Sequence, residues 1–233
     1  MATYVLVHGG WSGAHGFRHV RRLLQDAGHD VFTPSLTGIG ERVHLVSPQV
    51  DLSTHIHDVV NAVLYEDLDP IVLLGYSYGG AVVTGTLRHI ADRVQELVYL
   101  DAFVPEDGDT VWGLAGRDGE PAITLGEDWL VPPMPREYDD PTEGAWQQAR
   151  RVAHPLRCFT EPIRLDKPLE DHAFGLTFIK ATNDASESPD SAFWQAGRHA
   201  KPSTRWTYHE IATNHMVLSN RPSELAEVLL ALA

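Results

Sequence analysis

A serine flanked by glycines gives this sequence its clearest chemical signal. Ser77 lies in the stretch Gly75-Tyr76-Ser77-Tyr78-Gly79, spaced as G-x-S-x-G, directly after the apolar run 71–74. At such a turn between a strand and a helix the serine backbone is strained, and side chains at the two glycines would collide with neighbouring backbone. The helix N-terminus beside the hydroxyl favours a developing oxyanion. The pattern therefore predicts that Ser77 is a nucleophile.

A serine hydroxyl needs a base to become nucleophilic at neutral pH. The candidate is His215, in a loop between the last predicted strand and the last predicted helix, where the chain returns to the sheet edge that carries Ser77. His209 is the rival, but it sits directly on the end of the strand predicted over residues 204–208. We therefore expect His215 to be the base and His209 to be structural.

The base in turn needs an acid that orients its ring, and the sequence offers Asp184 and Asp101. Asp184 follows the strand predicted over residues 176–181, and Asp101 ends the strand predicted over residues 97–100. Both fit the chain order serine, acid, histidine that accompanies this kind of turn, and we favour Asp184. Asp101 stays open as the alternative acid.

Two backbone N–H groups must converge on the oxyanion that such a serine generates. Tyr78, the residue after the nucleophile, supplies one, and we expect Gly10 in His8-Gly9-Gly10 to supply the other. His8 is expected to brace this loop through hydrogen bonds. The chemistry predicted so far is acyl transfer through Ser77, His215 and an aspartate.

The elements that must position these residues alternate between strand and helix, which predicts an α/β fold: a parallel sheet of about six strands flanked by helices. Between Asp101 and Gly175 the alternation stops, and prolines and tryptophans accumulate. We interpret residues 105–175 as a cap inserted at the C-terminal edge of the sheet, and residues 1–104 and 176–233 as the core.

Composition narrows the class of protein. The chain has 233 residues, 43% of them apolar, enough for a large folded core. A net charge of −14 argues against nucleic acid or an anionic membrane as partner. A single cysteine, Cys158, excludes an internal disulfide, and no leader-like or membrane-spanning run is evident. We expect a cytoplasmic protein.

Two further patterns do not predict a cofactor. His55 and His57 are two residues apart, which on a helix turns their side chains to different faces. Gly38-Ile39-Gly40 lacks the strand and helix that surround a dinucleotide-binding loop. No metal and no nucleotide are therefore expected.

Taken together, several stretches resemble the α/β-hydrolase superfamily over essentially the whole chain, and within it the branch of plant methylesterases, hydroxynitrile lyases and bacterial esterases of that type. They are Val7-His8-Gly9-Gly10-Trp11, the Ser77 turn, Leu100-Asp101-Ala102-Phe103-Val104-Pro105, Thr182-Asn183-Asp184 and Asn214-His215-Met216. The resemblance implies catalytic roles for Ser77, Asp184 and His215, oxyanion roles for Gly10 and Tyr78, and a cap over an apolar acyl pocket.

The sequence departs from the branch at informative positions. The lyases have a lysine directly after the catalytic histidine to hold cyanide, and here that residue is Met216. Tyr76 stands where many relatives have histidine. Relatives that use an aspartate nucleophile are excluded by Ser77. The hypothesis that the protein is a lyase is weakened, because cyanide would have no cationic partner.

The sequence thus predicts a serine hydrolase that cleaves a carboxylic ester of a small, largely apolar molecule without a cofactor. Trp11, Trp112, Trp129 and Met216 are the expected pocket residues. A C–C bond lyase or hydrolase on the same triad, and a non-catalytic module that binds small molecules, remain as alternatives. The expected partner is the small-molecule ester, and a homodimer is left open.

Overall fold

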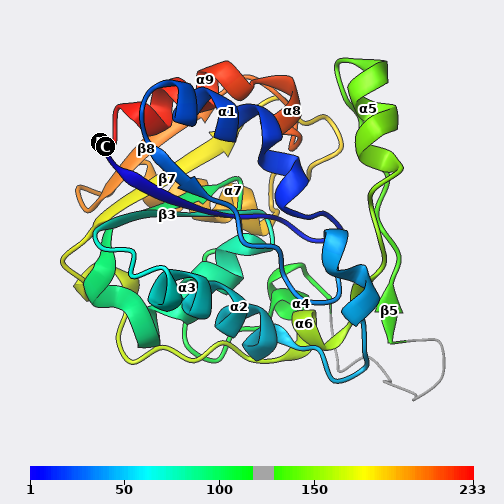
Figure 1. Cartoon of the computed structure of the whole chain (residues 1–233), viewed down its shortest axis with the longest axis horizontal. Coiled ribbons are helices and arrows are strands. Elements are labelled where there is room, and N and C mark those ends of the chain that lie inside the picture. Colours follow the sequence, from blue (N-terminus) through cyan, green and yellow to red (C-terminus); the bar gives the residue numbers. More distant parts are fainter. Residues whose placement is uncertain (118–128) are drawn as a thin grey trace.

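A parallel sheet with helices on both faces forms the body of the molecule in the computed structural model, which describes residues 1–117 and 129–233 (Figure 1). Its six strands follow the order β2-β1-β3-β4-β7-β8, and every neighbouring pair is parallel. This confirms the predicted fold class. The six strands are β1 (Thr3–Val7), β2 (Asp30–Phe32), β3 (Ile71–Tyr76), β4 (Val94–Leu100), β7 (Gly175–Ala181) and β8 (Trp206–Ile211).

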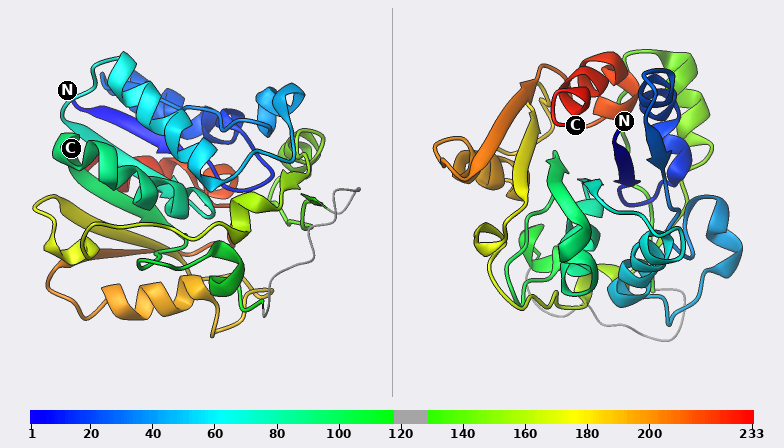
Figure 2. Two further views of the ribbon diagram at one scale, coloured as in Figure 1. Left: turned by 90° about the horizontal axis from the view of Figure 1, so that it is seen from below. Right: turned by 60° about the vertical axis from the view of Figure 1, so that its left-hand side comes forward.

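Helices cover both faces of the sheet (Figures 1 and 2). One face carries α1 (Arg18–Asp26), α8 (Val217–Asn220) and α9 (Pro222–Leu230), and the other carries α2 (Leu52–Tyr65), α3 (Gly79–Ile90) and α7 (Ala192–Ala200). Short 3-10 helices are η1 (Ala14–Phe17), η2 (Gly40–Leu45), η3 (Ala91–Arg93) and η4 (Leu169–Asp171). Within the described ranges, no helix is long and apolar enough to cross a membrane.

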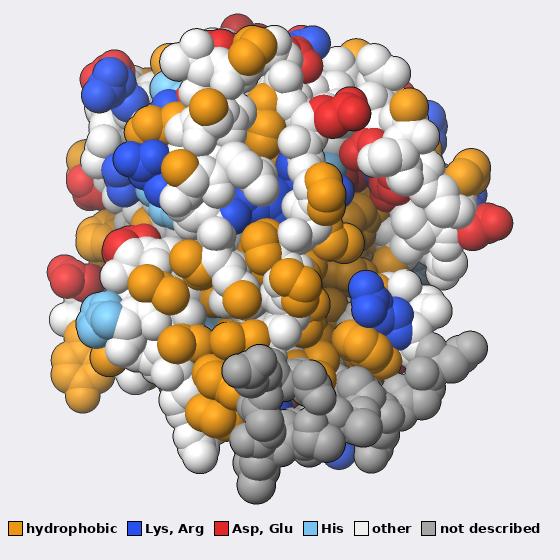
Figure 3. Space-filling view, turned by 90° about the vertical axis from the view of Figure 1, so that its right-hand side faces the viewer, with side chains coloured by type: hydrophobic (Ala, Val, Ile, Leu, Met, Phe, Trp, Pro, Cys, Tyr) orange, Lys and Arg blue, Asp and Glu red, His pale blue; other side chains and the backbone are white. Residues whose placement is uncertain are grey.

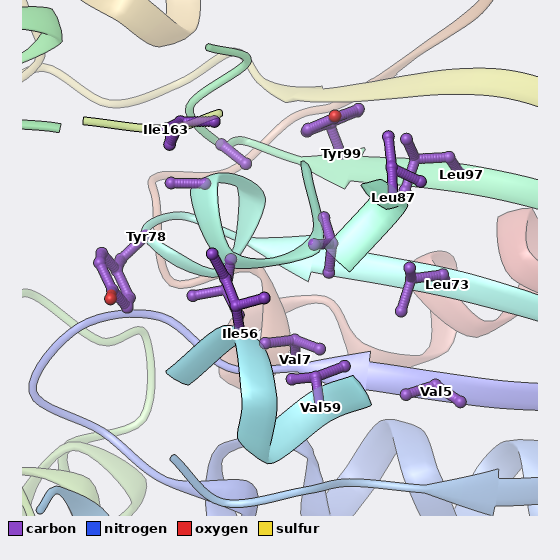
Figure 4. Packing of buried hydrophobic residues seen from close by; sticks show 14 of the residues in the cluster. Val5, Val7, Ile56, Val59, Leu73, Tyr78, Leu87, Leu97, Tyr99 and Ile163 are labelled. Atoms are coloured by element: carbon purple, nitrogen blue, oxygen red, sulfur yellow. The ribbon is translucent and has the colours of Figure 1, made fainter. Parts of the chain in front are cut away.

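The strands bury both of their faces, as parallel strands between two helical layers must. In β1, Tyr4 and Leu6 pack toward α1 and α9, while Val5 and Val7 pack toward α2 and α3. Figure 4 shows the second of these layers, in which Val5 and Val7 lie near side chains of β3 and α2. All six residues of β3 are buried, so the strand that leads to Ser77 is anchored on both sides.

The end of strand β8 differs from the sequence prediction. The strand runs on to Ile211, so His209 lies inside the strand rather than at its end. The loop that carries His215 keeps its predicted place. Helix α2 is capped by Asp51, whose Oδ1 accepts the Thr54 N–H, while Thr54 Oγ1 accepts the Asp51 N–H.

The connection between β4 and β7 contains short elements and no further strand of the main sheet within its described part. They are α4 (Val111–Leu114), β5 (Leu130–Val131), α5 (Pro141–Gln148), β6 (His154–Pro155) and α6 (Arg157–Thr160). Much of this connection lies beyond the carboxyl ends of the strands, on the right in Figure 1. The predicted cap boundaries at 105 and 175 remain a prediction, and part of that range, 118–128, lies outside the described residues.

Close contact between α3 and the chain after β4 gives a testable prediction. A Cβ added to Gly80 would lie 2.3 Å from the Phe103 carbonyl oxygen, whereas one added to Gly197 would meet nothing closer than 3.5 Å. We expect Gly80→Ala to lower the free energy of unfolding by about 2 kcal/mol or more, because backbone must move. Gly197→Ala, in α7, should be neutral or stabilising by up to ~1 kcal/mol. Urea denaturation of both variants tests this, and equal effects would contradict it.

Candidate active site

Ser77 occupies a left-handed turn between β3 and α3. Its φ is 56°, a conformation that costs energy for a residue with a side chain. The glycines on either side allow the turn: a Cβ on Gly75 would lie 2.6 Å from the Gly79 carbonyl oxygen, and a Cβ on Gly79 would lie 2.5 Å from that of Val7. The backbone N–H of Ser77 donates to Leu100 O at 3.2 Å, which ties the turn to the end of β4.

His215 reaches Ser77 from the loop after β8. Its Nε2 lies 3.0 Å from Ser77 Oγ, within hydrogen-bond distance. The imidazole is stacked between two aromatic rings, with ring centroids 5.0 Å from Tyr76 and 5.2 Å from Phe193. Tyr76 also donates its hydroxyl to the backbone carbonyl of His215 at 2.6 Å. Tyr76, noted in the sequence only as a departure, therefore holds both the ring and the loop of His215.

The structure pairs the His215 ring with Asp101 and not with the favoured Asp184. Asp101 Oδ2 lies 2.6 Å from His215 Nδ1, whereas Asp184 accepts the backbone N–H of His215 at 3.1 Å. The other oxygen of Asp184 accepts hydrogen bonds from the backbone and hydroxyl of Ser186. Asp101 directly follows β4, the neighbour of β3, and Ser77 directly follows β3, so both side chains lie at the same edge of the sheet. The alternative acid is the one paired with the imidazole.

A buried lysine holds Asp101 in place, and the sequence analysis did not single it out. Lys180 is fully buried in β7 and donates to Asp101 Oδ1 at 2.6 Å, Glu187 Oε2 at 2.8 Å and the Ala181 carbonyl at 2.7 Å. The sequence signal for this pairing was a lysine inside a mostly apolar strand, because buried lysines are almost always paired. With both oxygens engaged, Asp101 cannot rotate away from the ring.

These contacts determine the protonation states of Asp101 and His215. Burial opposes ionisation of Asp101, but the hydrogen bond from His215 and the charge of Lys180 outweigh it and lower the pKa of Asp101. Burial also lowers the pKa of His215 below its usual value, although Asp101 acts in the opposite direction. Asp101 is therefore ionised and His215 neutral at pH 7. In this state Nδ1–H donates to Asp101 and Nε2 accepts from Ser77.

Gly10 and Tyr78, the predicted oxyanion donors, lie next to each other beside Ser77. A Cβ on Gly10 would lie 3.7 Å from that of Tyr78, and one on Gly9 would lie 3.0 Å from that of Ser77. Among the hydrogen bonds of the described residues, neither the Gly10 nor the Tyr78 N–H donates to another protein group. Both N–H groups are thus available to a ligand.

Other contacts fix this loop. His8 accepts the Leu36 N–H at 3.1 Å through Nε2, and its Nδ1 lies 2.9 Å from Gly9 O, which confirms its bracing role. Trp11 has a φ of 61° and donates its backbone N–H to His154 Nδ1 at 3.3 Å. Its indole N–H donates to Val131 O at 2.8 Å. The connection between β4 and β7 therefore helps to shape the Gly10 loop.

Behind Tyr78 lie three side chains whose spacing would suit a metal: His55, His154 and Cys158, with donor atoms within 4.8 Å of one another. Both ring nitrogens of His55 already have partners, with Nδ1 2.9 Å from the Tyr78 hydroxyl and Nε2 2.8 Å from Thr37 O. A metal would have to displace one of them. Burial lowers the pKa of His55 to about 4, so it supports Tyr78 as a neutral ring.

Two cavities meet at Ser77 and His215. The larger, about 730 Å³, is lined by Trp11, Trp112, Phe103, Phe159 and Phe193 among others. The smaller, about 40 Å³, includes Met216, Arg136 and Arg151 in its lining. Trp11, Trp112 and Met216 thus line the site as expected, but Trp129 lines neither cavity, and its carbonyl accepts the Leu156 N–H. Figure 3 shows this side of the molecule, where apolar side chains gather around a hollow.

Comparison with known proteins agrees with the site. The model of the alpha/beta hydrolase family matches residues 4–228. The chain belongs to this family. It is 34% identical over 250 residues to a carbendazim hydrolyzing esterase of Nocardioides sp. (strain SG-4G), covering all of both chains.

Solved structures of the family agree with the fold. An extracellular alpha/beta-hydrolase from a Paenibacillus species superposes with a TM-score of 0.83 at 22% identity, over 100% of this chain and 99% of that one. A methylesterase of Arabidopsis superposes with a TM-score of 0.79 at 21% identity, over 99% and 98% of the two chains.

The lowered pKa of His215 predicts a pH profile. If His215 acts as a base, it works only when neutral, so kcat/KM should rise with pH through its pKa and then level off. We expect the midpoint of this acid limb below 6.5, because burial disfavours the charged ring. Ester hydrolysis from pH 4 to pH 9 measures it, and a midpoint above about 7 would contradict the environment described.

Proposed function

We propose that this protein hydrolyses a carboxylic ester of a small, largely apolar molecule, with Ser77 as nucleophile, His215 as base and Asp101 as orienting acid. The observation that carries the proposal is the continuous hydrogen-bonded chain from Asp101 through His215 to Ser77. In this arrangement the acid fixes the ring tautomer, so that Nε2 faces the hydroxyl as an acceptor.

The proposed reaction has two halves. His215 Nε2 takes the Ser77 proton while Oγ attacks the ester carbonyl, and the resulting oxyanion accepts hydrogen bonds from the Gly10 and Tyr78 N–H groups. The imidazolium then protonates the leaving alcohol, and an acyl-enzyme remains. A water molecule activated by His215 attacks this acyl-enzyme, and the acid is released.

The large cavity suits the acyl group of such an ester. Its aromatic lining offers apolar contact, and its volume of about 730 Å³ lies in the range of small-molecule sites. We propose that residues 105–175 act as a cap, since Val111, Trp112 and Phe159 from this range line the cavity. The esterase relatives support ester hydrolysis, and the cap would select the substrate.

One specific observation favours a second candidate function, that of a C–C bond lyase. Met216 replaces the lysine by which the plant lyases hold cyanide, yet Arg136 and Arg151 line the same small cavity as Met216. Positive charge therefore lies in the cavity beside Met216, where the sequence offered no cationic partner for cyanide. Among the curated relatives, an alpha-hydroxynitrile lyase of Arabidopsis is 22% identical over 259 residues. Cleavage of a cyanohydrin faster than of any ester would favour this candidate.

The ester function is tested with activated esters of graded acyl length, using the wild type and Ser77→Ala in parallel. We expect turnover that peaks at one acyl length and falls on the order of 10³-fold or more in the variant, because the nucleophile is lost. Activity that survives in Ser77→Ala would contradict the proposal.

The choice of acid is tested by two matched substitutions. Asp101→Asn should lower kcat by about 10³- to 10⁴-fold, because an amide no longer fixes the tautomer of His215. Asp184→Asn should cost less than about tenfold, since its amide oxygen still accepts the His215 backbone N–H. The same ester assay measures both, with thermal melting to show that each variant is folded. The reverse order of effects would assign the role to Asp184.

A further inference from the structure

The small cavity beside Ser77 contains two guanidinium groups with no carboxylate partner. Arg136 and Arg151 both come from the connection between β4 and β7 and line this cavity together with Ser77 and His215. Neither forms an ion pair with any described residue. The Arg151 side chain is hydrogen-bonded to Tyr138, but its Nε is buried and has no hydrogen-bond partner within the described ranges. A buried donor without a partner is costly, so its retention calls for an explanation.

The imbalance stands out because the chain carries 32 acidic and only 18 Lys and Arg residues. The carboxylates around the cavity are occupied elsewhere. Glu143 pairs with Arg18 and accepts a hydrogen bond from Gln147 at 2.8 Å. Asp101 is paired with Lys180 behind His215. Among the described residues that line the small cavity, Arg136 and Arg151 carry charge and no carboxylate does, so this lining is positive.

Size and position restrict what these arginines bind. The cavity holds about 40 Å³, and a single water needs roughly 10–15 Å³ on this measure, so it accepts a group of about three non-hydrogen atoms. A carboxylate has this size, and guanidinium groups bind it with charge-assisted hydrogen bonds. The larger cavity also reaches Ser77, and Arg136 lines both cavities. The larger cavity has charged residues in its lining, but Trp112, Phe103 and Phe193 line it and not the smaller one, so its aromatic part is left for the acyl group.

We infer that the preferred ester carries a carboxylate on its alcohol part, which Arg136 and Arg151 bind in the small cavity while the apolar acyl group occupies the large one. This inference rests on the proposed ester hydrolysis. It assigns the substrate class: an apolar acyl group joined to a short hydroxy acid. Hydrolysis releases the apolar acid from Ser77 and the hydroxy acid from the cavity, with one water consumed.

The test compares two esters that differ only in the carboxylate of the alcohol part: O-benzoyl glycolate and its neutral amide, O-benzoyl glycolamide. A second pair of esters has one more methylene in the alcohol part. For each enzyme the ratio of kcat/KM for acid over amide is measured, which cancels general losses of activity. We expect this ratio to fall by about tenfold or more in Arg151→Gln and Arg136→Gln. Arg151→Lys, which keeps the charge, should restore part of it.

The matched control is Arg22→Gln, which removes the same charge from an exposed position on α1. Its ratio should equal that of the wild type. The inference would be overturned if, for both pairs of esters, the acid-over-amide ratio of kcat/KM were the same in the wild type, Arg136→Gln and Arg151→Gln. In that case, hydrolysis of the amides that depends on Ser77 would still support the proposed function. If the wild type hydrolyses none of these esters or the activated esters, the proposed function itself fails.

Discussion

The site depends on keeping one negative charge buried. Asp101 is fully buried at the end of β4, and a carboxylate there is stable only while its charge is compensated. Lys180 from β7 supplies the positive charge, and His215 from the loop after β8 adds a hydrogen bond. The same contacts that stabilise the charge therefore aim the imidazole at Ser77. Fold stability and catalytic geometry are linked through this one carboxylate.

A second constraint is the close approach of backbone around Ser77. The turn brings α3 against β1 and against the chain after β4, with no room for side chains at Gly79 or Gly80. This packing places the Gly10 loop, the Tyr78 N–H and Asp101 around one hydroxyl. The aromatic rings of Tyr76 and Phe193 then stack on the imidazole of His215, which is buried.

Local patterns made the core of the site predictable from sequence. Ser77 and its glycines specify their own turn, and His215 follows from the order of strands and helices. The acid was harder, because Asp101 and Asp184 both follow strands, and only the side-chain geometry after β4 and β7 separates them. Trp129, Arg136 and Arg151 lie in the irregular connection, where no period predicts which way a side chain points. Their roles depend on tertiary contacts.

The pairing of His215 with Asp101 is the central claim, and the imidazole N–H proton reports on it most directly. Proton NMR of histidine-labelled protein should show a strongly downfield Nδ1–H resonance of His215, because that proton lies in a short hydrogen bond to a buried carboxylate. We expect it to persist in Asp184→Asn and to disappear or move far upfield in Asp101→Asn. A resonance that survives in Asp101→Asn and is lost in Asp184→Asn would contradict the account.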